Sequence, residues 1–84
     1  MSSIGAEFNT ATVSVSSSGT VASTTRTEVY TGSGGHSRTL PAASNSGRLV
    51  TIVDAGTGAV VFDGEIVYPS ESFTFKDVNT WEIV

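Results

Sequence analysis

The stretch RLVTIVD, residues 48–54, decides the fold class of this 84-residue chain. In an extended strand its side chains alternate, so Leu49 and Val53 lie on one face and Val50 and Ile52 lie on the other. Both faces are apolar, which is typical of a strand that is buried on both sides. Residues 48–54 therefore predict a central strand of a β-sheet.

The residues after this strand predict further strands joined by tight turns. AVVF (59–62) and EIVY (65–68) flank Asp63-Gly64, which is a strong signal for a two-residue hairpin. Large apolar and polar residues then alternate in SFTFK (72–76) and TWEIV (80–84). The large side chains of these strands are expected in the core or in a subunit interface: Leu49, Ile52, Val53, Phe62, Phe73, Phe75, Trp81 and Ile83.

The residues before the central strand are more polar but keep strand propensity. VASTTRTEVY (21–30) and SRTL (37–40) are separated by the glycine-rich loop TGSGGH (31–36). Pro41 ends the second of these strands because it has no amide hydrogen to donate. Residues 42–47, AASNSG, form a polar turn.

The N-terminal segment has few large apolar residues. TATVSV (10–15) alternates like a strand, and residues 16–19 form a flexible break. We expect residues 1–19 to be an extended N-terminal arm and residues 20–84 to be an antiparallel β domain. A disordered tail is the alternative for the arm, because so polar a segment offsets little of its ordering entropy.

Composition supports an all-β fold and an oligomer. Serine and threonine supply 25 of 84 residues and valine supplies 11, while no segment has the period of a helix. The predicted fold is a small antiparallel β-sandwich or barrel-like module. A domain of this size buries only about 60% of its unfolded surface and usually needs a disulfide, a metal or an oligomer. The chain has no cysteine and a single histidine, so we expect an oligomer.

Charge argues against two classes of partner. The net charge is −4, and the four basic residues, Arg26, Arg38, Arg48 and Lys76, are scattered along the sequence. Nucleic-acid binding and binding to anionic membranes both need clustered positive charge. No apolar run approaches the roughly 20 residues of a membrane-spanning helix. We therefore expect no nucleic-acid partner and no membrane partner.

Catalytic patterns are weak. His36 lies in a glycine-rich loop without a G-x-S-x-G elbow, so a nucleophilic triad is not expected. Residues 32–35 lack the lysine and the helix that a phosphate-binding loop requires. The candidate carboxylates for glycoside or calcium chemistry lie at turn-like positions: Asp54, Asp63, Glu65 and Glu71. We expect no enzyme activity, no cofactor and no metal site.

A series of short motifs occurs in a fixed order over residues 29–84. The motifs are Tyr30 with the glycine-rich loop, Thr39-Leu40-Pro41-Ala42, Gly47-Arg48-Leu49-Val50-Thr51-Ile52, Phe62-Asp63-Gly64, Glu71-Ser72-Phe73-Thr74-Phe75 and Trp81-Glu82-Ile83-Val84. The series resembles the short β-modules of bacteriophage tail fibres and capsid decoration proteins. This resemblance implies an antiparallel β fold that is often a homotrimer and a role in a virion, and it brings no catalytic residues.

Between these two virion roles, a length of 84 residues favours a small protein present in many copies. We expect a head decoration (cement) protein that is assembled in the host cytoplasm and binds the major capsid protein on the outer capsid surface. Ile4, Phe8, Val13 and Val15 would anchor the arm on the capsid. The alternative is a tail-fibre-associated or receptor-binding module whose loop 31–37 contacts a host surface glycan.

Overall fold

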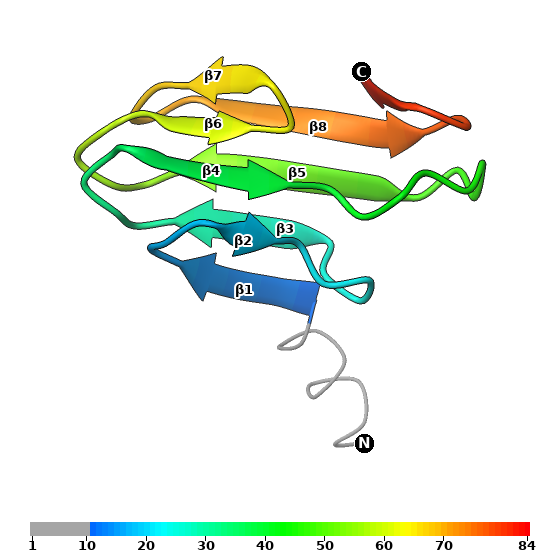
Figure 1. Ribbon diagram of the computed structural model, residues 1–84, viewed down its shortest axis with the longest axis horizontal. Helices are drawn as coiled ribbons and strands as arrows, with labels where there is room; N and C mark the ends of the chain where they lie inside the picture. Colours follow the sequence, from blue (N-terminus) through cyan, green and yellow to red (C-terminus); the bar gives the residue numbers. More distant parts are fainter. Residues whose placement is uncertain (1–10) are drawn as a thin grey trace.

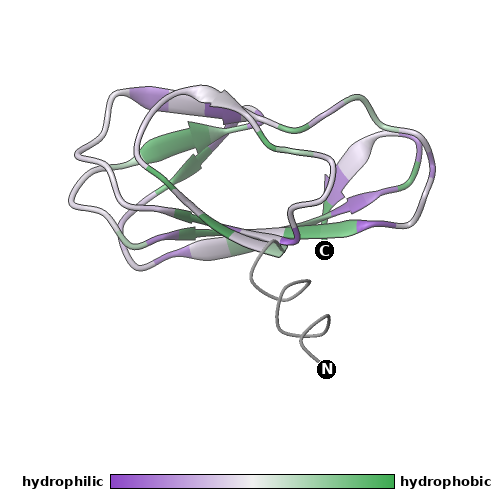
Figure 2. Ribbon diagram, turned by 90° about the horizontal axis from the view of Figure 1, so that it is seen from below, coloured by the Kyte–Doolittle hydropathy of each residue, from purple (hydrophilic) through white to green (hydrophobic). Residues whose placement is uncertain are grey.

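A computed structural model describes residues 11–84, which form two facing β-sheets (Figures 1 and 2). The five-stranded sheet has the order β1-β3-β5-β8-β9, and the four-stranded sheet has the order β2-β4-β6-β7. The nine strands are β1 (Thr12–Val15), β2 (Gly19–Thr20), β3 (Thr27–Tyr30), β4 (His36–Thr39), β5 (Leu49–Asp54), β6 (Val60–Phe62), β7 (Glu65–Val67), β8 (Ser72–Asp77) and β9 (Trp81–Ile83). All regular elements within residues 12–84 are strands, so the all-β prediction is confirmed.

The first six strands form a coil that changes sheet at every step. Strands β1, β3 and β5 run one way in the five-stranded sheet, and β2, β4 and β6 run the other way in the four-stranded sheet (Figure 1). Among these six strands, neighbours in the same sheet are therefore parallel. One example is the pairing of Thr27 in β3 with Thr51 in β5. We refer to β1–β6 as the coil.

The predicted antiparallel arrangement is wrong for the coil. Four strand pairs are parallel, and three pairs, β5–β8, β6–β7 and β8–β9, are antiparallel. Alternation of side chains reveals a strand but not its partner. In the coil each loop crosses to the opposite sheet, so the strand that follows in sequence is not the neighbour in the sheet.

The chain leaves the coil through the hairpin between β6 and β7. Asp63 and Gly64 have φ angles of 50° and 91°, the left-handed values that a tight hairpin turn requires. Strands β8 and β9 then add to the five-stranded sheet in antiparallel fashion. The predicted Asp63-Gly64 hairpin is confirmed, and we refer to β7–β9 as the cap.

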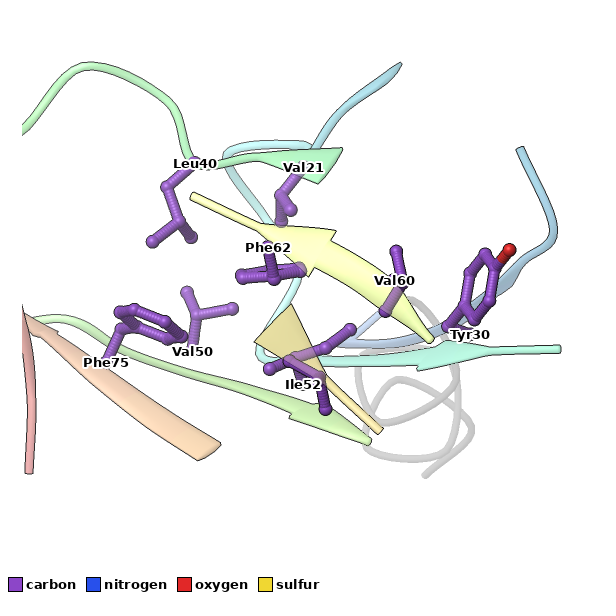
Figure 3. Close-up of a cluster of buried hydrophobic side chains, with 9 residues drawn as sticks. Val21, Tyr30, Leu40, Val50, Ile52, Val60, Phe62 and Phe75 are labelled. Atoms are coloured by element: carbon purple, nitrogen blue, oxygen red, sulfur yellow. The ribbon is translucent and has the colours of Figure 1, made fainter. Parts of the chain in front are cut away.

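The hydrophobic core lies between the two sheets (Figure 3). It is formed by Val21, Tyr30, Leu40, Val50, Ile52, Val60, Phe62, Val67 and Phe75. The rings of Phe62 and Phe75, from opposite sheets, have centroids 5.5 Å apart. The core positions predicted for Ile52, Phe62 and Phe75 are confirmed, while Phe73 and Trp81 are partly buried against the core.

Strand β5 is buried on one face only, so the prediction of burial on both faces is wrong for the single chain. Val50 and Ile52 point into the core, whereas Leu49 is 50% exposed and Val53 is half-buried. A sandwich of two layers covers each sheet on one side, which leaves the other face of β5 outside. Ile83 is also exposed, and the prediction that Leu49 and Ile83 belong to a subunit interface stays a prediction.

Strand β1 carries the described part of the predicted arm. The strand predicted for residues 10–15 is found at Thr12–Val15, where it pairs with β3. Val13 is half-buried, and Val15 packs against the core. Ile4 and Phe8 lie outside the described residues.

Candidate functional site

A buried ion pair joins the two sheets inside the coil. Glu28 of β3 is 1% exposed, and its two carboxylate oxygens accept hydrogen bonds of 2.8 Å from Nε and Nη2 of Arg38 in β4. Nη1 of Arg38 also donates to the carbonyl oxygen of Ser17 at 3.2 Å. The hydrogen bond to Glu28 raises the pKa of Arg38 above its ordinary value, against the opposing effect of burial. Both charged groups are therefore engaged in holding the layers together.

A second buried carboxylate, that of Asp77, holds the loop 42–47. Its oxygens accept hydrogen bonds from the amides of Ser44 and Asn45 at 2.9 Å each and from the hydroxyls of Ser44 and Ser46 at 3.1 and 3.0 Å. Burial alone would raise the pKa of Asp77, but these hydrogen bonds outweigh it and hold the pKa well below its usual range. The ionised carboxylate of Asp77 thus stabilises the loop 42–47.

The candidate nucleophilic triad at His36 is not assembled. Nδ1 of His36 lies 2.8 Å from the hydroxyl of Tyr30, and that hydroxyl accepts a hydrogen bond from the amide of Gly34 at 3.0 Å. Within residues 11–84, no hydrogen bond joins the imidazole to a serine or to a carboxylate. His36 therefore helps to order the glycine-rich loop against the buried Tyr30.

The four candidate carboxylates do not form one group. Asp54 is fully buried at the end of β5, where Oδ1 accepts a hydrogen bond from the amide of Gly56 at 2.9 Å. Oδ2 of Asp54 has no hydrogen-bond partner among the described residues. Asp63 accepts a hydrogen bond from the amide of Leu40, which is distant in the sequence, and Glu71 accepts one from the nearby amide of Tyr68. No cluster of three or more potential metal ligands occurs in the described part of the chain.

The outer face of the five-stranded sheet carries a shallow depression of about 690 Å³. We call it the basic depression, and it is lined by Arg26, Thr27, Gly47, Arg48, Leu49, Thr51 and Thr74. Thr27, Thr51 and Thr74 are aligned across three neighbouring strands, and the hydroxyls of Thr51 and Thr74 are 2.9 Å apart. Lys76 adjoins the depression because it pairs with Leu49 across the β5–β8 ladder.

Arg48 is held in place at the edge of the basic depression. Its Nη2 donates to the carbonyl oxygen of Ala22 at 2.9 Å and to that of Thr25. Its guanidinium carbon lies 6.0 Å from the ring centroid of Trp81, a cation–π distance. Sequence reasoning missed this grouping of basic residues, because only the parallel register of β3 and β5 brings Arg26 and Arg48 to one end of the sheet.

The outer face of the β6–β7 hairpin has the opposite character. Val61 and Ile66 are paired across the hairpin and are 37% and 51% exposed, and Tyr68 just beyond β7 is 55% exposed. The acidic side chains around this hairpin are Asp63, Glu65 and Glu71, all of them exposed. Glu65 pairs with the buried Phe62, so it lies at the edge of the hairpin rather than on its outer face. We call Val61, Ile66 and Tyr68 with these three acids the acid-rimmed patch. Contiguous exposed apolar residues with a polar rim are typical of a protein contact surface.

Comparison of the chain with protein-family models, with curated proteins and with solved structures finds no match. Among the described residues, no helix has the length and apolar character needed to cross a membrane.

Proposed function

We propose that this protein is a virion structural protein, specifically a head decoration (cement) protein that binds the outer capsid surface as a homotrimer. The observation that carries the proposal is that the buried charged groups make contacts within the chain, while the exposed faces of the sheets are left for a partner. Internal hydrogen bonds engage the charged groups of Glu28, Arg38 and Asp77. The surface consists of the broad outer faces of the two sheets. Broad faces with apolar and charged residues suit a protein partner.

The motifs that resemble phage β-modules also contact one another in the fold, which supports the proposal. Nε1 of Trp81, in the last motif, donates a hydrogen bond of 2.7 Å to the carbonyl oxygen of Pro41, in an earlier one. Leu40 belongs to the core, and Asp63-Gly64 forms the hairpin turn. The quoted residues thus help to build the module, although the parallel pairing of β1–β6 departs from the antiparallel fold that the resemblance implies.

The proposed mechanism is thermodynamic linkage. A protein that binds the assembled shell, and not its separated subunits, stabilises the shell by mass action. At a free concentration of 100 times the Kd, each site contributes about 2.7 kcal/mol. The net charge of −4 suits the outer surface of a capsid, away from packaged nucleic acid.

Strand β1 is the place where a capsid segment would add to the fold. It is one of the two edge strands of the five-stranded sheet within residues 11–84, the other being β9, and it pairs with β3 on one side. A partner strand pairing with the other side would gain main-chain hydrogen bonds. Val13 and Val15 of β1, together with Ile4 and Phe8, are the proposed anchors of this contact.

The test is binding to empty capsids of the virus that encodes the protein. We expect saturable binding that raises the temperature of capsid disruption, and weaker binding after residues 2–10 are deleted. A matched control is Thr57→Ala, an exposed substitution in the loop after β5. Binding to host cells or polysaccharide without capsid affinity would instead support the tail-fibre alternative. Turnover of a glycan or ester that His36→Ala or Asp63→Asn abolishes would contradict a purely structural role.

A further inference from the structure

The two outer faces carry opposite charge. Of the four basic residues in the chain, Arg38 is buried in its ion pair with Glu28. The other three gather at the basic depression, where Arg26 and Arg48 line the wall and Lys76 adjoins Leu49. Glu82 is the acidic neighbour on this face, because it pairs with Lys76 in the β8–β9 ladder.

The acid-rimmed patch is the complement of this surface. Its three acids have no basic neighbour in the β6–β7 pairing, and no salt bridge joins them to another described residue. Its apolar centre, Ile66 and Tyr68, matches the half-exposed Leu49 in the basic depression. Charge and apolar character are therefore complementary between two surfaces of the same chain.

We propose that the acid-rimmed patch of one copy docks into the basic depression of a second copy. Apolar contacts of Ile66 and Tyr68 with Leu49 form the centre of the interface. Glu71 and, from the edge of the hairpin, Glu65 approach Arg26 and Lys76 at its rim. This arrangement follows the usual organisation of interfaces, in which a desolvated apolar centre is surrounded by polar groups.

The position of the two surfaces defines the type of contact. They lie on the outer faces of opposite sheets, so they cannot meet within one molecule (Figure 2). The contact is therefore heterologous, and each copy uses one surface of each kind. Such contacts form a ring when the rotation closes and a longer assembly when it does not. The inference rests on the self-association in the proposed function and names the surfaces that would carry it.

The test uses charge reversal of one surface at a time, read by sedimentation velocity. Variant one carries Arg26→Glu and Lys76→Glu, and variant two carries Glu65→Lys and Glu71→Lys. All four residues are exposed, and the formal net charge of variant two changes from −4 to 0. Net repulsion between copies therefore cannot explain a loss of association in variant two.

We expect the wild type to associate at micromolar concentration, and more weakly in 1 M salt, where the screening length falls to about 3 Å. Each variant alone should associate about 100-fold more weakly, and a one-to-one mixture should recover association, because the reversed surfaces complement each other. The neutral pair Arg26→Gln and Lys76→Gln, which adds no repulsion, should weaken association about tenfold. The matched control Glu82→Lys should associate at least as tightly as the wild type.

A wild type that stays monomeric, a single variant that associates normally, or a mixture that does not recover would overturn the inference. Assemblies larger than a trimer that follow the expected variant pattern would support these surfaces while contradicting the trimer in the proposed function. Capsid binding by the charge-reversed variants separates a failure of the inference from a failure of the proposed function. Charge-reversed variants that still bind capsids and that associate as tightly as the wild type would overturn the inference. They would leave the proposed function intact.

Discussion

The coil and the cap are built from similar short strands, but they reach their neighbours differently. At the start of the cap, β7 follows β6 through a two-residue turn, and β9 follows β8 through a three-residue turn within its own sheet. In the coil, β3 and β5 are neighbours although β4 lies between them in the sequence. The comparison teaches that local turn signals suffice for the β6–β7 and β8–β9 pairs, while the coil and the β5–β8 pair depend on contacts between segments that are distant in the sequence.

The largest expected effect comes from the ion pair that joins the layers of the coil. Glu28→Ala leaves the guanidinium of Arg38 buried without its carboxylate, which should cost about 3–5 kcal/mol of unfolding free energy. The measurement is the urea unfolding midpoint. The double variant Glu28→Leu with Arg38→Met should be close to the wild type, since no charge is then left unpaired. A destabilisation below about 1 kcal/mol for Glu28→Ala would show that the coil does not depend on this pair.

The next expected effect concerns the contact of the cap strand β8 with the loop 42–47. Asp77→Asn replaces one acceptor oxygen with a donor that faces the amides and hydroxyls of Ser44 and Ser46, so the melting temperature should fall. Because the folded pKa of Asp77 is lowered, its contribution is complete above about pH 4, the ordinary pKa of aspartate, and is lost as pH falls toward the folded value.

The difference in melting temperature between wild type and Asp77→Asn should therefore narrow as the pH is lowered below about 4. Thermal unfolding followed by circular dichroism over this range provides the measurement. A difference that is constant with pH would mean that the ionised carboxylate of Asp77 is not what holds the loop.

A smaller effect is expected at the turn that separates coil from cap. Gly64 has φ 91°, and an added β-carbon would meet no atom within 4 Å, so Gly64→Ala should cost about 1–2 kcal/mol through backbone strain alone. Gly64→Asn is the matched control and should cost less, because asparagine tolerates left-handed angles. Equal denaturant midpoints for wild type and Gly64→Ala would argue against this turn geometry.

The smallest expected effect concerns the end of the cap. Trp81→Phe keeps an aromatic ring but removes the hydrogen bond from Nε1 to the carbonyl oxygen of Pro41, which should cost about 1 kcal/mol. Chemical denaturation measures the loss. A variant as stable as the wild type would show that burial of the ring, rather than this hydrogen bond, secures β9.

These two regions also mark how far the sequence could predict the structure. The strand class, the Asp63-Gly64 hairpin and the core positions of Ile52, Phe62 and Phe75 follow from alternation and turn chemistry. The parallel order of the coil does not, because alternation carries no information about a distant partner.

The candidate surfaces were likewise invisible in the sequence. Arg26 and Arg48 are separated by 21 residues, and they line one depression only because β3 and β5 pair in parallel. Burial of Glu28 with Arg38 also depends on the facing of two sheets, and nothing in either local segment indicates it. Sequence patterns therefore identify strands, whereas the register between strands creates the basic depression.

The central claim is the parallel pairing of β3 with β5, since it aligns Thr27 with Thr51 and builds the basic depression. Backbone nuclear Overhauser contacts in the labelled protein test it directly. We predict contacts between α-protons and amide protons that connect residues 27–30 with residues 51–54 in increasing order along both strands. Strong contacts between α-protons of β3 and β5, with residue numbers rising in one strand and falling in the other, would contradict the account.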